Sequence, residues 1–400
     1  MNTKVLRDDF SFLTQSRWIY FDNACQSLRP RQVVEAIADY YNNYPVCAGR
    51  SNYRLAVELQ NKLTEVRQQV TDFIGAKKSN EIVFTRNTTE GINLIANCYQ
   101  FEEGDVVLIS DKEHNSNLIP WLQLVKSKKI KLEIVKTNDD NSWNWANFEE
   151  KLTNKVKLVS LGITSNLDGI TIPFKEIITK SHSLGAKVLL DGAQWVGHNP
   201  TNVSDWDVDF LVFSGHKTLG PSGTGVLYGK MSELEKLTEY QLGGSTVADS
   251  TYTNFELLPI PQKFEAGLQD YADILGLGKA LEYLKSVGWD NIKSEESKVS
   301  DVLYEGISNI SGIEIIGGTD STNRNGIISF YHPQISSHQI SILLDQNSNI
   351  LVRSGRHCVH SWFNARNITD SVRISASFYN TIEEAEKTIT ELKKIVEVLT

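Results

Sequence analysis

The feature that most constrains the fold is an alternation of short apolar runs with helix-like segments between residues 21 and 258. In the clearest helix-like segment, Leu55–Ile74, apolar side chains recur every three or four residues, which is the spacing of one helix face. A chain that alternates strands and helices predicts a mostly parallel sheet with helices on both faces. The predicted strands are Ile82–Phe84, Val106–Ile109, Leu158–Leu161, Val188–Leu190 and Phe210–Phe213, and further predicted helices are Thr89–Cys98 and Phe174–Leu184.

A different rhythm follows a loop-rich stretch at residues 241–262, which contains paired glycines and two prolines. It begins with one long helical region, Ile274–Leu303, and continues with short strands. We therefore predict an α/β protein with a large domain at residues 21–262 and a smaller α+β domain at residues 263–400. The segment 1–20 is expected to pack with the small domain. The shorter elements are the strands Ile313–Ile316, Gly326–Phe330, Ile350–Val352 and Val372–Ser375 and the closing helix Ile382–Val398.

The composition is that of an ordinary globular protein, with 40% hydrophobic and 22% charged residues. Lys and Arg number 40 and Asp and Glu 49, and the net charge of −9 makes sequence-independent nucleic-acid binding a poor candidate function. No apolar run approaches the roughly 20 residues that span a bilayer, and the charged start is unlike a secretory leader. We expect a cytoplasmic protein without nucleic-acid or membrane partners, whose four widely spaced cysteines are reduced.

Polar residues gather where predicted strands end. Asp191 follows one strand, in VLLDGAQ, and Ser214 and Lys217 follow the next, in FSGHKTLGPSGTG. Thr88 and Thr89 start a helix in RNTTEGIN, where free backbone N–H groups form a ready anion site. Open α/β sheets bind ligands at the carboxyl ends of their strands, so these groups are expected to meet. A lysine, a carboxylate and a phosphate cradle are what pyridoxal phosphate needs for its aldehyde, its ring nitrogen and its phosphate.

Each of these features has a simpler interpretation when it stands alone. A Ser or Thr before a helix is usually a cap, an Asp after a strand is often a turn residue, and a lysine in a glycine-rich loop is usually solvated. Two other nucleotide-site motifs do not fit, because G-H-K-T is not the Walker sequence and G-x-G-x-x-G is absent. The combination of residues therefore favours the pyridoxal-phosphate hypothesis.

Nine sequence blocks occur in the order typical of one enzyme family. They are YFDNACQSLRP, RNTTEGINL, EHNSNLIPW, TSNLDG, LLDGAQ, SGHKTLGPSGTGVLYG, FEAG, RSGRHC and VRISASFYNT. With these blocks the chain resembles the class V aminotransferase group of pyridoxal-phosphate enzymes, especially the SufS-like cysteine desulfurases. The resemblance covers nearly the whole chain. It implies fold type I, pyridoxal 5′-phosphate as cofactor, and a homodimer with sites near the subunit interface.

The resemblance also implies a role for residues in several blocks. Lys217 corresponds to the Schiff-base lysine, and Asp191 corresponds to the partner of the ring nitrogen. His114 corresponds to the imidazole stacked on the ring, Gln194 to the donor to the ring hydroxyl, and Asn166 to the asparagine near substrate and ring. The implied phosphate ligands are Thr89, Ser214 and His216, beside Thr88 at the same helix start, and the implied clamp on the substrate α-carboxylate is Arg373.

Cys358, in RSGRHC, decides among the chemistries of this family. An isolated cysteine is usually an inert packing residue, but Arg353 and Arg356 stand nearby in the sequence, and cations favour the reactive thiolate. The match to the desulfurase block implies that Cys358 attacks the substrate sulfur and carries it as a persulfide. The spacing His357-Cys358-x-His360 is cramped for a tetrahedral metal site, and no metal is expected.

Four segments depart from the family pattern. Leu268-Gln269-Asp270 follow FEAG in place of a Thr-Pro segment whose threonine reaches the phosphate of the partner subunit. Arg356 stands where many relatives have a second histidine, and Val-His-Ser-Trp-Phe follows the cysteine where Ala-Gln-Pro-Leu is usual. The run CAGRSNYRLA replaces an arginine-glycine-valine-histidine run. We expect these changes to affect the preferred substrate and acceptor more than cofactor binding.

We therefore predict a cysteine desulfurase that converts L-cysteine to L-alanine and passes the sulfur from Cys358 to an acceptor protein, such as a scaffold for iron–sulfur cluster assembly. The alternative is a pyridoxal-phosphate-dependent C–S or C–Se lyase acting on cystine or selenocysteine, which needs no persulfide on the enzyme. An aminotransferase would leave Cys358 without a task, and Lys217 and Asp191 argue against a non-catalytic sulfur-relay protein. Cys25 and Cys98 are expected to be structural.

Overall fold

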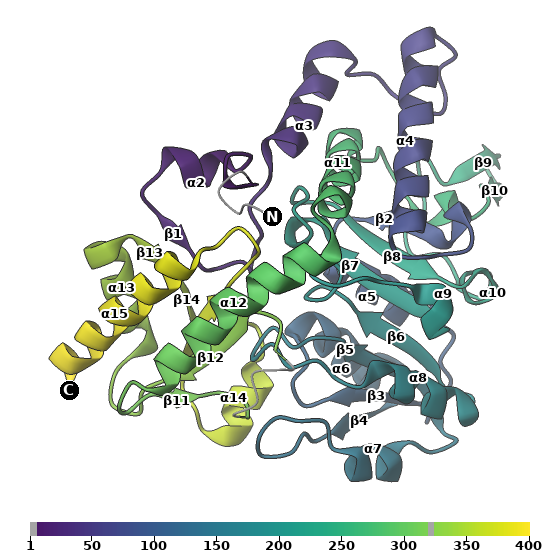
Figure 1. Ribbon diagram of the computed structural model, residues 1–400. Coiled ribbons are helices and arrows are strands. Elements are labelled where there is room, and N and C mark those ends of the chain that lie inside the picture. The colour runs from purple at the N-terminus through teal and green to yellow at the C-terminus, as the bar shows by residue number, and fades with distance from the viewer. Residues whose placement is uncertain (1–5, 319–323) are drawn as a thin grey trace.

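The computed structural model describes residues 6–318 and 324–400. Within this part of the chain, two larger sheets lie side by side, and each is covered by its own helices (Figure 1). The first sheet belongs to the blue and teal part of the chain, and the second belongs to the green and yellow part. We call them the large sheet and the small sheet.

The large sheet has seven strands in the order β2-β8-β7-β6-β5-β3-β4. The strand β8 (Gly225–Gly229) runs antiparallel to both neighbours, and the other neighbouring pairs are parallel. Most of these strands are buried along their length, which explains why they stand out in the sequence as continuous apolar runs. The other strands are β2 (Ile82–Thr85), β3 (Val106–Ser110), β4 (Lys131–Val135), β5 (Val156–Gly162), β6 (Lys187–Asp191) and β7 (Phe210–Ser214).

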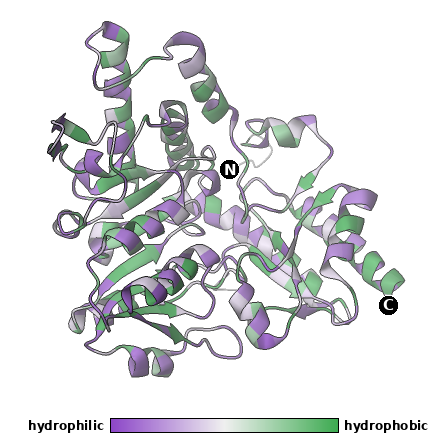
Figure 2. Cartoon of the chain, turned by 180° about the vertical axis from the view of Figure 1, so that it is seen from behind, coloured by the Kyte–Doolittle hydropathy of each residue, from purple (hydrophilic) through white to green (hydrophobic). Residues whose placement is uncertain are grey.

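Helices cover both faces of the large sheet, and each face has its own hydrophobic core. Leu59 of α4 and Ile177 of α8 belong to the core of one face, and Ile92 of α5 and Trp121 of α6 belong to that of the other. Figure 2 shows the strands of the sheet largely in the colour of hydrophobic residues. The helices are α3 (Arg31–Asn43), α4 (Arg54–Phe73), α5 (Thr88–Cys98), α6 (Ile119–Lys128), α7 (Trp145–Lys151), α8 (Phe174–Ser183), α9 (Val203–Trp206) and α10 (Met231–Leu234).

The small sheet has four antiparallel strands in the order β11-β12-β15-β14. Its helices α12, α13 and α15 pack around a core that includes Phe330 and Leu392. The small sheet and its helices are called the second unit below. The N-terminal strand β1 (Ile19–Tyr20) pairs with β13 (Ile350–Leu351), so the start of the chain contacts this second unit. The remaining elements are α2 (Ser11–Gln15), β9 (Val247–Ser250), β10 (Phe255–Leu257), α11 (Tyr271–Val287), α12 (Trp289–Ser308), β11 (Glu314–Ile315), β12 (Ile327–Tyr331), α13 (Ser337–Ser348), β14 (Arg353–Gly355), α14 (His360–Arg366), β15 (Ser371–Ser375) and α15 (Ile382–Leu399).

The prediction of one continuous helical region over Ile274–Leu303 is wrong. Two helices, α11 and α12, meet at Gly288, whose φ of 83° lies in the left-handed region that glycine adopts easily. The first of them packs against α3 and α4, while the second packs against α15 of the second unit. The domain bounds at residues 20 and 262 stay a prediction, since α11 keeps close contact with helices of the large sheet.

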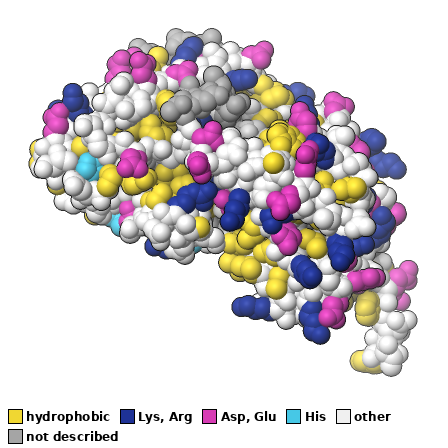
Figure 3. Space-filling view, turned by 90° about the horizontal axis from the view of Figure 1, so that it is seen from below, with side chains coloured by type: hydrophobic (Ala, Val, Ile, Leu, Met, Phe, Trp, Pro, Cys, Tyr) yellow, Lys and Arg dark blue, Asp and Glu magenta, His cyan; other side chains and the backbone are white. Residues whose placement is uncertain are grey.

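The surface carries charges of both signs. On the face that Figure 3 shows, Lys and Arg side chains are interspersed with Asp and Glu side chains. Among the helices in the described ranges, none combines the length and the apolar character needed to cross a membrane.

Candidate active site

A cavity of about 240 Å³ lies at the carboxyl ends of the central parallel strands. The last residues of β3, β5, β6 and β7 line it, as expected for a ligand site of an α/β sheet. Residues of the small sheet and of the turn before α14 complete its wall. The structure brings together in this lining every site residue predicted from the sequence, which are Thr88, Thr89, His114, Asn166, Asp191, Gln194, Ser214, His216, Lys217, Cys358 and Arg373.

Lys217 and Asp191 are placed by two neighbouring strands. Asp191 is the last residue of β6, and Lys217 ends a short 3-10 turn that follows β7. Burial lowers the pKa of Lys217, and the Arg373 guanidinium lowers this pKa further. Burial raises the pKa of Asp191, whose carboxylate accepts a hydrogen bond from the Ala193 amide at 2.9 Å. A lysine with a lowered pKa offers a neutral amine, which is the form that adds to an aldehyde.

The N-terminus of α5 forms another part of the wall. The Thr88 amide donates to Ser214 Oγ at 2.8 Å, and the hydroxyl oxygens of these two residues lie 2.7 Å apart. The Thr89 hydroxyl oxygen lies 2.7 Å from that of Ser116. Hydroxyl groups beside a helix N-terminus suit an anion such as phosphate, because the helix dipole and the first amides favour negative charge.

Two histidines in the wall are neutral near pH 7. Burial lowers the pKa of His114 to about 3, with smaller contributions from Lys217 and Arg373. The Ser116 amide donates to Nδ1 of this ring at 3.0 Å, so the neutral imidazole carries its proton on Nε2. Burial likewise lowers the pKa of His216 to about 4. Both rings can therefore pack and form hydrogen bonds without adding positive charge beside Lys217.

Arg373 lies in β15 and reaches the cavity almost fully buried. Its Nη1 donates to the Asn166 carbonyl at 3.0 Å, and its Nη2 lies 3.3 Å from the Asp22 carboxylate. Its Nε is buried and has no partner among the described residues. A buried guanidinium with an unused donor in a cavity wall suits a carboxylate ligand.

Cys358 lies on the turn between β14 and α14. Both His357 and Cys358 have positive φ angles, 48° and 59°, which side chains with a Cβ rarely adopt. The Asn115 amide donates to the Cys358 carbonyl at 2.7 Å, and the Asn166 side chain donates to the His357 carbonyl at 2.7 Å. Arg356 directs its guanidinium to Asn364 and to a backbone carbonyl. The thiol thus reaches the cavity on a turn held by residues of the large sheet's loops.

Comparison with known proteins assigns the chain to a family. The family described as Aminotransferase class-V matches residues 19–388. The chain belongs to the class-V aminotransferase family. The family assignment made from the sequence is therefore confirmed.

Individual class-V relatives are similar over most of the chain. A protein of Synechococcus elongatus named cysteine desulfurase is 36% identical over 383 residues, which are 94% of this chain, but the match spans 60% of that relative's length. A cysteine desulfurase of Shigella sonnei is 35% identical over 384 residues, covering 95% of this chain and 94% of that protein. The structure of a cysteine desulfurase from Thermococcus onnurineus has a TM-score of 0.95 at 33% identity, covering 99% and 98% of the two chains. The predicted fold class is confirmed.

The cavity wall contains a second thiol, that of Cys25, which was predicted from the sequence to be structural. Cys25 lines the same cavity as Cys358, and the charge of either thiolate would raise the pKa of Lys217. The Arg353 guanidinium donates to Cys25 Sγ at 3.2 Å and lies 3.8 Å from the Asp22 carboxylate. The one available signal was the position of Cys25 inside the block YFDNACQSLRP.

A buried carboxyl group in the cavity wall, that of Glu113, was also not predicted from the sequence. Burial raises the pKa of Glu113 to about 7, although the Asn117 side chain and the Gly162 amide donate to it at 2.7 and 2.9 Å. Glu113 precedes His114 in the chain, and only this adjacency could have drawn attention to it. The wall therefore holds one carboxyl group that changes its charge near neutral pH.

The residues that line the cavity fit pyridoxal 5′-phosphate. A buried lysine with a lowered pKa, a carboxylate at the adjacent strand end and a helix N-terminus with hydroxyl groups meet in one cavity. The unused Nε of Arg373 provides a donor for an additional anionic group. These features match the aldehyde, the ring nitrogen and the phosphate of this cofactor, together with the carboxylate of an amino-acid substrate.

Proposed function

We propose that this protein is a cysteine desulfurase that converts L-cysteine to L-alanine and leaves the sulfur on Cys358 as a persulfide. The observation that carries the proposal is the shared cavity, because Lys217 from the large sheet and Cys358 from the second unit line the same space. The names of relatives that match nearly the whole chain support the same activity.

The proposed cofactor is pyridoxal 5′-phosphate, which when bound supplies an electron sink that acidifies the Cα proton of an amino acid. Lys217 would hold its aldehyde carbon, and Asp191 would face its ring nitrogen. A protonated ring nitrogen beside Asp191 would favour the ionised carboxylate, and so would oppose the effect of burial on the pKa of Asp191. The remaining proposed contacts are the ring for His114, the ring hydroxyl for Gln194, the phosphate for Thr88, Thr89, Ser214 and His216, and the ring edge for Asn166.

Arg373 is proposed to bind the α-carboxylate of the substrate. Its guanidinium is buried, its orientation is fixed by Asn166 and Asp22, and its Nε is free for a ligand. A planar guanidinium binds a carboxylate with two parallel hydrogen bonds, so it orients the substrate as well as holding it. Asn166 also bonds the turn before Cys358, so the substrate clamp and the thiol share one support.

Lys217 is proposed to move the proton at the substrate Cα. Because burial lowers its pKa, more of the amine is neutral and able to accept a proton than in an exposed lysine. The thiolate of Cys358 then attacks the substrate sulfur. The S–S bond forms as the C–S bond breaks, and the electron pair stays with the substrate carbon, which takes a proton to give alanine. Atoms and electrons balance without an external oxidant.

A homodimer, a sulfur-acceptor protein and a cytoplasmic location complete the proposal. Large apolar side chains are exposed on the hairpin β9–β10 and on the loops beside it, where a second copy of the chain could cover them. The exposed residues are Leu242, Tyr252, Phe255 and Leu268. Leu268 belongs to the segment that replaces the usual cross-subunit phosphate contact, so this dimer contact would differ from that of the relatives.

Product analysis with L-cysteine tests the proposed function. We expect the wild-type protein, supplied with cofactor and a reductant, to release alanine and sulfide in equal amounts. In Cys358→Ala we expect alanine formation to fall at least about 100-fold, because the nucleophile is lost. Borohydride should still trap the cofactor on Lys217 in this variant. The exposed Cys47 offers a matched control, and Cys47→Ala should keep the wild-type rate.

Two results would contradict the proposal. Full alanine formation by Cys358→Ala would exclude the persulfide on this residue. Pyruvate and ammonia as the main products would favour the C–S lyase alternative, which eliminates sulfide without a nucleophilic thiol. Selenocysteine as a second substrate tests the C–Se lyase alternative, because the weaker C–Se bond can break in Cys358→Ala without a nucleophilic thiol.

A further inference from the structure

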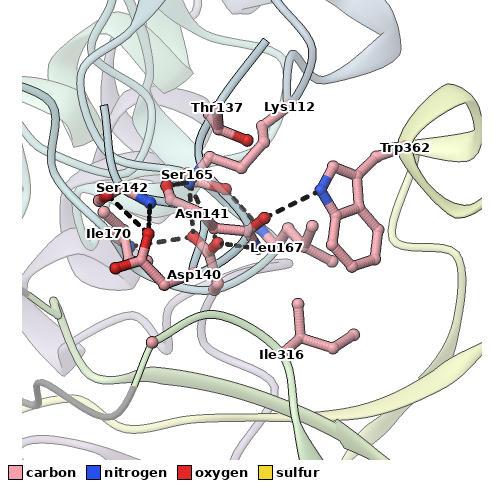
Figure 4. Close-up of polar contacts among 12 residues, drawn as sticks. Lys112, Thr137, Asp140, Asn141, Ser142, Ser165, Leu167, Ile170, Ile316 and Trp362 are labelled. Carbon is pink, nitrogen blue, oxygen red and sulfur yellow. Dashed lines mark hydrogen bonds and ion pairs between the residues drawn. The ribbon is translucent and has the colours of Figure 1, made fainter. Parts of the chain in front are cut away.

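A buried polar network lies beside the cavity and reaches the segment that carries Cys358 (Figure 4). It consists of Lys112, Asn141, Asp168 and Trp362, which we call the Asn141 network. The side chains of Lys112 and Asp168 are 3% and 0% exposed, so this ion pair is shielded from water. A charge pair this deeply buried persists only when further hydrogen bonds satisfy it, which fixes its geometry.

Asn141 is the centre of this network. Its carbonyl accepts from Lys112 Nζ at 2.8 Å, and its Nδ2 donates to the Asp168 carboxylate at 2.9 Å. With Nδ2 committed to Asp168, its Oδ1 is left as an acceptor, and the indole N–H of Trp362 donates to it at 3.2 Å. Asn141 has a positive φ of 62°, held within a turn closed by Asn138 and Ser142. The turn and the contacts with Lys112 and Asp168 therefore fix the orientation of Asn141 Oδ1, independently of Trp362.

Trp362 connects the network to the second unit. It lies in α14, four residues after Cys358, and packs among Leu167 of the large sheet's loops and Ile316 of the second unit. Figure 4 shows its indole nitrogen directed at Asn141. The hydrogen bond therefore fixes the start of α14, and with it the end of the turn that carries Cys358.

Two other network members, Lys112 and Asp168, also lie close in the chain to residues that contact this turn. Lys112 lies three residues before Asn115, whose amide binds the Cys358 carbonyl. Asp168 lies two residues after Asn166, whose side chain binds the His357 carbonyl. The turn itself has two consecutive positive φ angles at residues with a Cβ, which neighbouring contacts must stabilise. The network thus joins α14 to the two segments whose residues Asn115 and Asn166 bind this turn.

We propose that Trp362 is a positioning residue, whose indole N–H bond to Asn141 holds Cys358 in place for attack on the substrate sulfur. This inference rests on the proposed function and names how its nucleophile is oriented. Trp362 stands in the run Val-His-Ser-Trp-Phe, one of the segments in which this chain departs from the family pattern. The device would therefore be particular to this chain.

The sharpest variant is Trp362→Phe, which keeps an aromatic ring in the core and removes the N–H donor. Trp143→Phe is the matched control, because the Trp143 indole N–H is buried and has no partner among the described residues. Loss of one positioning hydrogen bond should lower the rate of alanine formation about 3- to 10-fold, with KM for L-cysteine and trapping of the cofactor on Lys217 unchanged. The control should stay at the wild-type rate.

A second readout does not depend on activity. Iodoacetamide labelling, mapped by mass spectrometry, measures how accessible each thiol is in the protein without substrate. We expect Cys358 to be labelled about 3- to 10-fold faster in Trp362→Phe than in wild type or Trp143→Phe, because the turn opens more often. Labelling of Cys47, which is distant in the chain, should not change.

A double-mutant cycle keeps the test independent of general destabilisation. Asn141→Gly removes the acceptor, and glycine tolerates the positive φ at this position. If the hydrogen bond carries the effect, the double variant should be no slower than Asn141→Gly alone. Multiplying effects, or equal behaviour of Trp362→Phe and Trp143→Phe in both readouts, would overturn the inference. Unaltered alanine formation in Cys358→Ala would instead overturn the proposed function, and the labelling result would remain.

Discussion

The two walls of the cavity are built by different means. The wall from the large sheet consists of residues at strand ends, such as Asp191 at the end of β6 and Ser214 at the end of β7. Every residue of β7 is buried, and so is every residue of β6 except Lys187 at its start. The wall from the second unit presents Cys358 on a turn in an unfavourable backbone conformation. Hydrogen bonds from Asn115 and Asn166 of the large sheet's loops hold that turn.

The difference separates two tasks. Strand ends in a close-packed sheet move little, so groups that hold a cofactor are placed by the core itself. A nucleophile that must reach the substrate and then give up its sulfur lies on a loop, whose position depends on a few polar contacts. Variants on the large-sheet wall are therefore expected to abolish activity because they remove groups that hold the cofactor. Variants around the other wall are expected to change activity because they change the position of Cys358.

The largest effect is expected for Lys217→Ala. This change removes the only group proposed to hold the cofactor covalently, so we expect loss of borohydride-trapped cofactor and of nearly all alanine formation. The melting temperature of the cofactor-free protein should not fall, because a buried amine with a lowered pKa contributes no favourable charge. Peptide mapping of the trapped wild-type protein should place the adduct on Lys217. An adduct on Lys112, the other lysine of the cavity wall, would contradict the assignment.

A smaller loss on the same wall is expected for Asp191→Asn. The amide keeps the shape of the side chain and removes its charge, so we expect alanine formation to fall about 10²- to 10³-fold. The cofactor should still be trapped on Lys217, although less tightly bound. Measuring the cofactor Kd and kcat separately tests this expectation. If binding is lost while the rate per bound cofactor is unchanged, Asp191 serves only to hold the cofactor.

A third test uses the buried carboxyl group of Glu113, whose effect is on stability. Its folded-state pKa of about 7 lies above its ordinary value of 4.5, so the folded protein keeps the proton longer than the unfolded chain. Stability from this group is full below pH 4.5 and falls as pH rises to about 7, by on the order of 3 kcal/mol.

Glu113→Gln cannot ionise and should remove this part of the pH dependence. Urea unfolding at pH 5 and pH 8 measures the free energy of unfolding of both proteins, and the variant should lose less stability between these values. Equal losses in the two proteins would mean that the carboxyl group is ionised in the folded state at both pH values.

The smallest effect is expected for Cys25→Ala, which compares the two thiols of one cavity. Arg353 donates to Cys25, but it also lies beside Asp22 and keeps that neighbour when the thiol is removed. We expect alanine formation within about 2-fold of wild type, since a single weak hydrogen bond to sulfur is lost. Mapping of the persulfide by alkylation and mass spectrometry should find it on Cys358. A persulfide on Cys25, or a large loss of rate, would mean that both thiols take part.

Five of the seven strands of the large sheet were predicted, because burial on both faces demands short continuous apolar runs, as in Phe210–Ser214. The strand Gly225–Gly229 was missed, since glycines at both ends and a preceding glycine-rich loop hide its apolar centre. The break at Gly288 was missed for a related reason, because a single glycine within a helical pattern does not by itself reveal a positive φ. Relatives named cysteine desulfurase also bear out the predicted activity.

The sequence by itself determined the family, the mostly parallel sheet and eleven of the residues that line one cavity, because each of these residues lies in a local block next to a strand or helix end. Only the tertiary structure decided which groups are charged there, since the lowered pKa of His114 and the raised pKa of Glu113 come from burial among segments far apart in the chain. It also decided how Cys358 is held. A positive φ at a residue with a Cβ has no signature in the sequence, and the contacts that stabilise it come from residues more than a hundred positions away, such as Asn115 and Asn166.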